Sequence, residues 1–148
     1  MSAPLLSVRD LVVEFATDNG VVRAVDGVSF DISAGETLEL VGESGCGKTV
    51  TSLALLGLIP SPPGRIVGGS IEMQGKDLTK LDEDELRRIR GSEISMIFQE
   101  PMTALNPVFR IGSQMVDVLK RHQGLTSKQA LTHVARKLVR VFVYPDLR

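Results

Sequence analysis

Alternating apolar and polar residues open the chain and predict two strands. From Leu6 to Phe15, and again from Val21 to Ile32, β-branched and apolar residues alternate with polar ones, as in strands that bury one face. Asp18-Asn19-Gly20 lies between the two segments and is a turn sequence of the kind that joins hairpin strands. The chain therefore begins with a predicted β-hairpin.

The middle of the chain alternates short apolar segments with amphipathic ones. A helix is predicted from Lys48 to about Leu58, and a shorter helix from Glu83 to Arg90, which Asp82 caps and whose acids precede its arginines. The remaining apolar segments have the composition of strands, and the last is nearly all apolar, as in a parallel strand covered on both faces. These three predicted strands are Thr37 to Val41, Gly68 to Met73 and Ile94 to Phe98.

The end of the chain has the spacing of helices. One is predicted from about Ile111 to His122 and another from about Thr126 to Val141, where Thr126 and Gln129 have the spacing of a capping box. The pattern as a whole predicts an α/β fold. We expect residues 1–107 to form its β-rich and α/β part and residues 108–148 to begin a helical part.

Composition narrows the functional classes. A chain of 148 residues with 43% hydrophobic residues is typical of a soluble domain with a core. The net charge of -1 provides no basic field for nucleic acid, and no apolar run approaches the roughly 20 residues that cross a bilayer. The single cysteine, Cys46, cannot form an internal disulfide, and the N-terminus has no secretory signal. We expect a cytoplasmic protein without nucleic-acid binding or membrane insertion.

A glycine-rich loop between a predicted strand and a predicted helix is the candidate site. Its eight residues are Gly42-Glu43-Ser44-Gly45-Cys46-Gly47-Lys48-Thr49. Backbone amides at a helix N-terminus can converge on phosphate oxygens, and glycines let the backbone come close. Lys48 would reach the β- and γ-phosphates while the Thr49 hydroxyl enters the magnesium shell. The loop predicts binding of a nucleoside triphosphate with Mg²⁺; the alternative is a glycine-rich turn whose lysine is a surface charge.

Two further residues complete a pattern that resembles the nucleotide-binding subunit of an ABC transporter. They are Phe15, in Val12-Val13-Glu14-Phe15, and Gln99, in Ile97-Phe98-Gln99-Glu100-Pro101. The resemblance implies that Phe15 stacks on adenine and that the loop, extended to Val50, binds ATP. It also implies that Lys48 and Gln99 act in catalysis and that Thr49 and Gln99 contact Mg²⁺. Taken singly, Phe15 reads equally well as a core aromatic, Gln99 as a polar loop residue, and Cys46 as a tolerated loop residue rather than a redox sensor.

Longer stretches resemble one subfamily, the importers of dipeptides, oligopeptides and nickel. The resemblance extends from about Leu5 to Val139 and implies a P-loop NTPase core of ABC type, with an N-terminal antiparallel β subdomain and the start of a helical subdomain. It implies an ATPase that energises import of peptides or nickel. The stretches are Ala24 to Phe30, Gly35 to Leu38, Gly42 to Gly45, Pro63 to Ile71 and Phe98 to Pro107.

The resemblance also implies partners and an incomplete catalytic site. Transmembrane permease subunits and a second ABC ATPase subunit, identical or different, are the expected partners, at the inner face of the cytoplasmic membrane. In the family, the signature motif, the second carboxylate-bearing strand, the catalytic glutamate and the switch histidine follow the region that ends at Arg148. We therefore expect a truncated chain that hydrolyses little ATP alone; the alternatives are a non-enzymatic nucleotide-binding module and an inactive truncated gene product. The transported substrate is not encoded in these residues.

Overall fold

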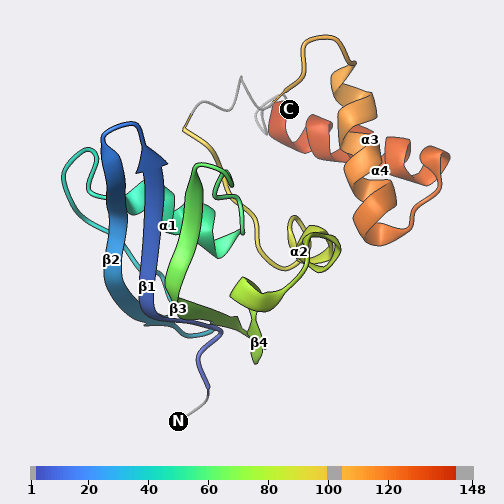
Figure 1. Cartoon of the computed structure of the whole chain (residues 1–148). Helices are drawn as coiled ribbons and strands as arrows, with labels where there is room; N and C mark the ends of the chain where they lie inside the picture. Colours follow the sequence, from blue (N-terminus) through green and yellow to red (C-terminus); the bar gives the residue numbers. More distant parts are fainter. Residues whose placement is uncertain (1–2, 100–104, 143–148) are drawn as a thin grey trace. The chain divides into compact units, whose positions relative to one another are not determined.

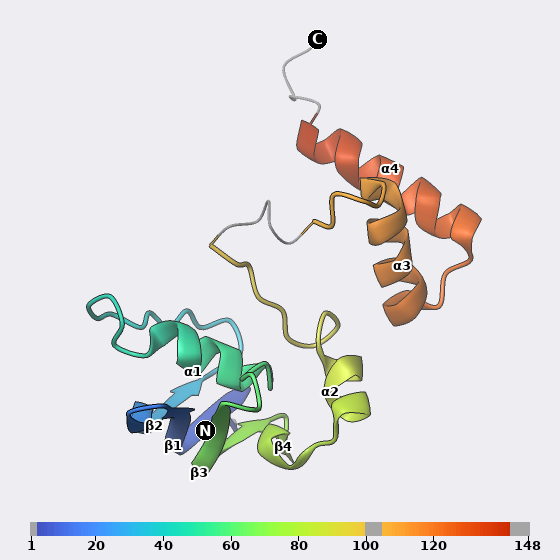
Figure 2. The same ribbon diagram turned by 45° about the horizontal axis from the view of Figure 1, so that its top comes forward.

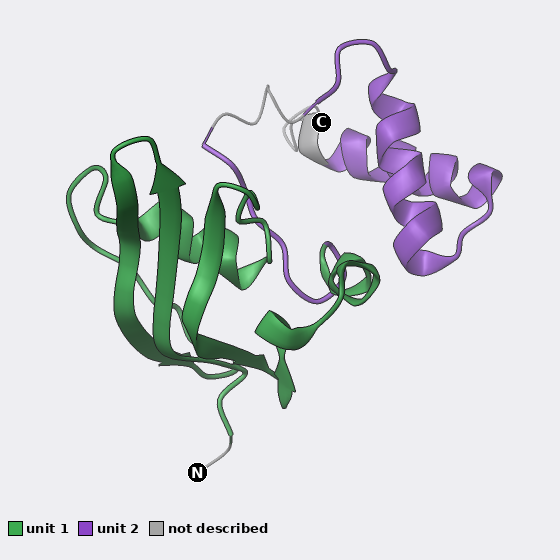
Figure 3. Ribbon diagram, viewed as in Figure 1, with its two compact units in different colours: residues 1–90 green, residues 91–148 purple. Residues whose placement is uncertain are grey.

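The computed structural model describes residues 3–99 and 105–142, which fall into two compact units (Figure 3). Unit 1 comprises residues 1–90 and unit 2 residues 91–148. Part of the Phe98 to Pro107 stretch, residues 100–104, lies outside the described residues. The expected division at residue 107 concerns the subdomains of a larger fold and stays a prediction.

Unit 1 is built on a four-stranded antiparallel sheet with the order β2-β1-β3-β4 (Figure 1). The predicted hairpin is confirmed, and its pairing continues to Thr17 and Gly20, so that Asp18 and Asn19 alone form the turn. The strand predicted at Gly68 to Met73 is confirmed and begins earlier. The strands are β1 (Leu6–Thr17), β2 (Gly20–Ile32), β3 (Gly64–Met73) and β4 (Lys76–Asp77).

The helix α1 (Lys48–Leu55) lies across one face of this sheet (Figure 2). Inward-facing side chains of the central strands, such as Leu11, Val13 and Ile71, are completely buried, and Ala54 of α1 is buried with them. Full burial of one such side chain stabilises a fold by about 1.5–3 kcal/mol. The core therefore fixes α1, and with it the loop that precedes α1, on the sheet.

A second, shorter helix, α2 (Glu83–Ile89), follows the one-turn 3-10 helix η1 (Leu78–Lys80). The Asp82 carboxylate accepts a hydrogen bond from the Glu85 amide at 2.8 Å, and the Glu85 carboxylate accepts one from the Asp82 amide at 3.1 Å. This reciprocal pair satisfies two amides at the helix start. The predicted helix and its aspartate cap are confirmed.

Two predicted strands do not form. Residues 37–41 have no regular secondary structure, and in residues 94–98 only Ile94 takes part in an isolated bridge; neither segment is paired with a strand in the described part of the chain. Val41 is 85% exposed and Ile97 is 93% exposed. A parallel strand exists only through hydrogen bonds to a neighbouring strand, and an apolar run in the sequence does not supply that neighbour. The strand predictions for these two segments were therefore wrong for this chain.

Unit 2 consists mainly of two helices that pack on each other, α3 (Ile111–Gln123) and α4 (Ser127–Phe142). Gly124, with a φ of 63°, ends α3, and Thr126 forms the predicted capping box with Gln129 before α4. Ala130 and Val134 of α4 are buried. The two predicted helices are confirmed. Within residues 3–99 and 105–142, no helix combines the length and apolarity that a membrane span requires.

Candidate phosphate-binding loop

The loop runs into the first turn of α1 through two glycines with left-handed backbone. Gly45 has a φ of 84° and Gly47, which immediately precedes α1, a φ of 93°. Glycine adopts this conformation without the penalty that a Cβ brings. No side chain caps the helix start, and the first amide satisfied along α1 is that of Thr51, which donates to the Gly47 carbonyl at 2.8 Å. Within the described residues, the amides of Lys48, Thr49 and Val50 in the first turn of α1 are therefore available to an anionic ligand, whereas the Cys46 amide donates to the Glu43 carbonyl at 3.4 Å.

Close packing explains two of the glycines. A Cβ on Gly47 would lie 2.3 Å from the carbonyl oxygen of Ala24 on β2, and a Cβ on Gly42 would lie 2.5 Å from the Cys46 sulfur. Thr51 is only 4% exposed, and its hydroxyl donates to the Gly47 carbonyl at 3.0 Å. The end of the loop is thus held between β2 and the first turn of α1.

The Lys48 ammonium group lies inside the loop. Its Nζ donates to the carbonyl oxygens of Gly42 at 2.6 Å and Glu43 at 2.7 Å, and lies 3.4 Å from the Cys46 sulfur. An ammonium group has three donors and no acceptor, so these contacts satisfy it without an acidic partner. A positive charge is consequently already in place where an anionic ligand of the loop would meet it.

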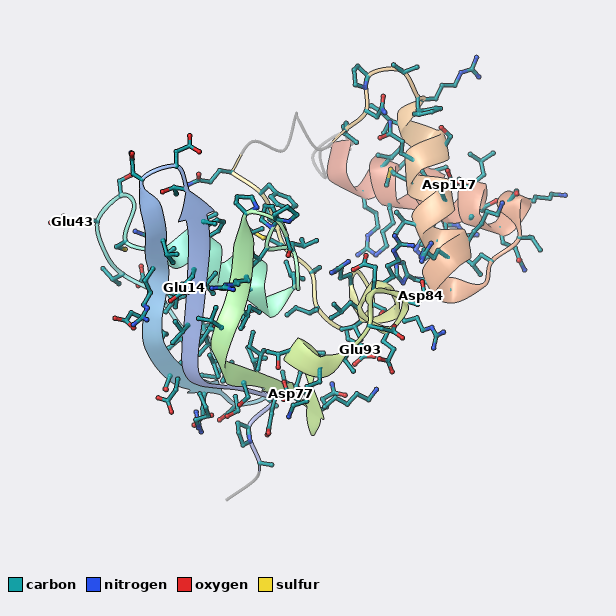
Figure 4. All side chains as sticks on the ribbon, in the orientation of Figure 1. Glu14, Glu43, Asp77, Asp84, Glu93 and Asp117 are labelled. Carbon is teal, nitrogen blue, oxygen red and sulfur yellow. The ribbon has the colours of Figure 1, made fainter. Side chains whose placement is uncertain are left out.

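The remaining loop residues face solvent. Glu43, Ser44 and Cys46 are exposed, and Glu43 lies at the outer turn of the loop and points away from the sheet (Figure 4). The Thr49 hydroxyl is exposed and makes no hydrogen bond within the described part of the chain, so it is free to act as an oxygen ligand of the kind that magnesium prefers. Val50 is half-buried.

No protein cage for a metal is present in the residues that the structure describes, which contain no group of three or more His, Cys, Asp and Glu side chains. Magnesium is commonly held by one or two protein ligands together with substrate phosphates. The exposed Thr49 hydroxyl fits that mode of binding.

Phe15 lies on β1 and shares a sheet face with Val13, two residues earlier. Val13 pairs with Val25 of β2, and Val25 is also close to Gly47, with its Cγ2 3.6 Å from the position of a Cβ there. The half-buried Phe15 ring packs on Gly64, where an added Cβ would lie 2.7 Å from the ring carbon Cε1. Phe15 and the loop thus belong to the same unit. Its contact with adenine stays a prediction.

Gln99 is exposed and follows the apolar segment 94–98. It belongs to unit 2, whereas the loop belongs to unit 1. Its predicted contact with magnesium and water therefore stays a prediction.

Sequence reasoning missed three residues that hold α1 in place: Ala24, Thr51 and Arg90. Thr51 had a local signal, because a threonine hydroxyl commonly bonds the carbonyl four residues earlier in a helix. Ala24 and Arg90 had none. The Arg90 side chain bonds the carbonyls of Leu56 and Gly57, which precede it by 34 and 33 residues.

Surface hollows elsewhere do not compete with the loop as a triphosphate site. Two of about 420 and 480 Å³ lie on the helices of unit 2, and both are lined in part by His133. Neither includes a residue of the glycine-rich loop. The first lies at the start of α4, where the Gln129 amide already donates to the Thr126 hydroxyl. The loop itself is an open surface feature, so its fitness for phosphate rests on its donors rather than on enclosure.

The fold and the loop agree with one protein family. A family profile described as ABC transporter matches residues 25–143. The chain belongs to the ABC transporter family.

Within that family, the chain is similar to ATP-binding proteins of peptide transport from Bacillus subtilis (strain 168). It is 48% identical to the oligopeptide transport ATP-binding protein OppD, an alignment that covers 95% of this chain and 39% of OppD. It is 49% identical to the dipeptide transport ATP-binding protein DppD, covering 96% of this chain and 42% of DppD. The chain spans about two fifths of the length of these relatives.

A solved structure has the same fold. The dimeric ATP-binding cassette MJ0796, in a post-hydrolysis state bound to ADP and Pi, matches with a TM-score of 0.77 at 19% identity. The match covers 95% of this chain and 58% of that chain. At this identity, the likeness shows the fold alone.

Proposed function

We propose that this chain is the ATP-binding part of an ABC ATPase that energises import of peptides, or of nickel, across the cytoplasmic membrane. The observation that carries the proposal is the Lys48 ammonium group inside a glycine-rich loop at the start of α1. Membership of the ABC transporter family supports it. The similar transport ATP-binding proteins for oligopeptides and dipeptides support the peptide substrate.

In the proposed complex, the loop from Gly42 to Val50 surrounds the phosphates. Its amides donate to phosphate oxygens, and the positive end of the α1 dipole favours their charge. Lys48 would exchange its carbonyl contacts for the β- and γ-phosphates, and the Thr49 hydroxyl would supply one oxygen ligand to the magnesium ion. Bound magnesium would neutralise phosphate charge and polarise the γ-phosphate. Phe15 stacks on adenine.

Hydrolysis in this proposal requires a second protein surface. Gln99 would contact magnesium and the attacking water, while the general base and the facing signature motif come from parts of the family fold outside these 148 residues. A well-placed general base contributes about a hundred- to ten-thousand-fold in rate. A polypeptide of these residues is therefore proposed to bind ATP with little turnover.

The proposed partners follow from the same family. Permease subunits would change conformation when the ATPase binds and hydrolyses ATP. A second ATPase subunit, identical or different, would close the nucleotide site. The solved relative is described as dimeric, which supports pairing of such cassettes. The proposed location is the cytoplasmic face of the membrane, where the chain is peripheral.

Calorimetric titration with MgATP tests the nucleotide site. We expect saturable binding by the unsubstituted chain and a loss of affinity of about 10- to 100-fold in Lys48→Ala, because a hydrogen bond to a charged group contributes about 1.5–3 kcal/mol. Lys76→Ala is the matched control, since Lys76 is an exposed lysine on β4. Equal affinity in Lys48→Ala, or no binding by the unsubstituted chain, contradicts the proposal.

A further inference from the structure

The C-terminal end of α1 is held by a side chain from a distant part of the sequence. Arg90, which directly follows α2, donates from Nε to the carbonyl oxygen of Leu56 at 2.6 Å and from Nη2 to that of Gly57 at 2.8 Å. The last carbonyl groups of a helix receive no hydrogen bond from an amide of the same helix. Arg90 therefore acts as a side-chain cap of α1.

The packing around this cap is close and specific. Gly57 has a φ of 60°, and a Cβ there would lie 2.8 Å from Leu86 Cδ1 and 3.2 Å from Arg90 Nη2. The Arg90 side chain is only 19% exposed. α2 thus lies directly against the turn that ends α1, and the left-handed backbone at Gly57 favours glycine there.

Glu83 orients the Arg90 guanidinium group. Its carboxylate accepts from Nη1 at 2.9 Å and from Nη2 at 3.3 Å, while the two helix carbonyls occupy the other side. A planar guanidinium group serves carboxylate and carbonyls together, which the single ammonium group of lysine does not. The arrangement is therefore specific to arginine.

The length of α1 connects this cap to the phosphate loop. The helix has only eight residues, about two turns, and so short a helix is not stable without fixed ends. A cation at the C-terminal end of α1 also stabilises the helix, because it interacts favourably with the negative end of the helix dipole. Loosening of Leu56 and Gly57 consequently reaches the first turn, where Lys48 and Thr49 lie.

We propose that Arg90 is a positioning residue for nucleotide binding: by capping α1 against α2, it holds Lys48 and Thr49 in the orientation that the phosphates require. The proposal rests on the proposed function of the loop. Coupling of this kind is reciprocal, so a nucleotide at the N-terminal end of α1 also strengthens the Arg90 contacts.

Hydrogen exchange of the whole 148-residue chain tests the cap without any ligand. We expect the amides of Thr51 to Gly57 to exchange about tenfold faster or more in Arg90→Ala, from the loss of hydrogen bonds to a charged group. Arg87→Ala is the matched control, because Arg87 lies on α2 and bonds Glu83 at 3.0 Å but caps no carbonyl of α1. We expect it to leave the exchange of α1 unchanged.

The same variants titrated with MgATP test positioning. We expect the dissociation constant to rise about three- to tenfold in Arg90→Ala, less in Arg90→Lys, and not at all in Arg87→Ala. MgATP should also slow exchange in α2 of the unsubstituted chain, and this protection should disappear in Arg90→Ala. An arginine that only stabilised the fold would not link MgATP binding to slower exchange in α2.

Each outcome decides the proposal. Unchanged α1 exchange in Arg90→Ala, or faster exchange with unchanged affinity for MgATP, overturns it. If the unsubstituted chain does not bind MgATP, the proposed function of the loop fails and the positioning role falls with it, while the exchange of α1 still decides whether Arg90 caps this helix. If Arg90→Ala does not fold, Arg90→Lys and Glu83→Gln provide the comparison, and equal affinity in both overturns the proposal.

Discussion

Gly45 and Gly47 have similar left-handed backbones but different surroundings. A Cβ on Gly45 would meet nothing within 4 Å, whereas a Cβ on Gly47 would lie 2.3 Å from the Ala24 carbonyl oxygen. Left-handed strain costs about 1–3 kcal/mol, and a forced steric contact costs about 1–3 kcal/mol more. Substitution of Gly45 therefore measures backbone strain alone, whereas substitution of Gly47 measures backbone strain together with the steric contact.

We expect Gly47→Ala to lower the free energy of unfolding more than Gly45→Ala, by about 1–3 kcal/mol. Urea unfolding followed by circular dichroism measures the difference. Both substitutions introduce the same methyl group into the same loop, so Gly45→Ala is the control for backbone strain. Equal losses in the two variants would show that the contact between Gly47 and β2 is absent in solution.

Cys46 provides a direct report on the loop because it is the single cysteine of the chain and is exposed. Its sulfur lies beside the Lys48 ammonium group, in the loop that a nucleotide would cover. We expect saturating MgATP to slow alkylation of Cys46 several-fold, and to lose this effect in Lys48→Ala. Mass spectrometry of the intact chain measures the labelled fraction over time. Alkylation at the same rate with and without MgATP means that no nucleotide occupies the loop.

The binding residues of the loop could be predicted from the sequence because their contacts join residues that are close together along the chain. Lys48 bonds carbonyls only five and six residues away, and the helix start lies within the same motif. Arg90 could not be recognised in this way, because its acceptors become neighbours only after α2 has packed on α1. The sequence therefore predicts the chemistry of the site more completely than its mechanical support.

At the scale of elements, predictions succeeded where the contacts are local and failed where they join distant parts of the chain. The hairpin and the helices depend on turns and caps a few residues long, such as Asp82 with Glu85. A strand at residues 37–41 or 94–98 would require a neighbouring strand, and no strand of the described part pairs with these segments. Their apolar composition indicated burial but could not identify the partner.

The junction of α1 and α2 has a predictable pH dependence. The hydrogen bond from Arg90, together with that from Arg87, lowers the pKa of Glu83 below its ordinary value of 4.5. A carboxyl group with a lowered pKa in the folded state contributes stability above its unfolded pKa and loses that contribution as the pH falls through its folded pKa. The contribution of Glu83 should therefore be intact at neutral pH and lost in acid.

We expect the unsubstituted chain to be more stable than Glu83→Gln at neutral pH and down to about pH 5, with the difference shrinking below the ordinary carboxyl pKa. Urea unfolding midpoints measured across this range test the expectation. Asp84→Asn is the matched control, because Asp84 is an exposed neighbour that approaches Arg87 only at 4.0 Å. A difference between the unsubstituted chain and Glu83→Gln that is independent of pH would contradict the ion-pair explanation.

At the scale of the whole molecule, binding and turnover are separable properties. The loop supplies a cation, helix-start amides and a hydroxyl, which are groups that bind phosphate and magnesium. The one acid within the loop, Glu43, is exposed and points away from the sheet (Figure 4). Affinity for MgATP therefore does not imply hydrolysis.

We expect a polypeptide of these 148 residues to bind MgATP and to release phosphate no faster than its Lys48→Ala variant. The physical reason is that positioning without proton transfer forgoes a contribution of about a hundred- to ten-thousand-fold. Phosphate release measured over many hours at saturating MgATP, beside calorimetric binding on the same preparation, separates the two properties. Sustained release that disappears in Lys48→Ala would place a complete hydrolytic site within these residues, and Gln99→Ala would then show whether Gln99 belongs to it.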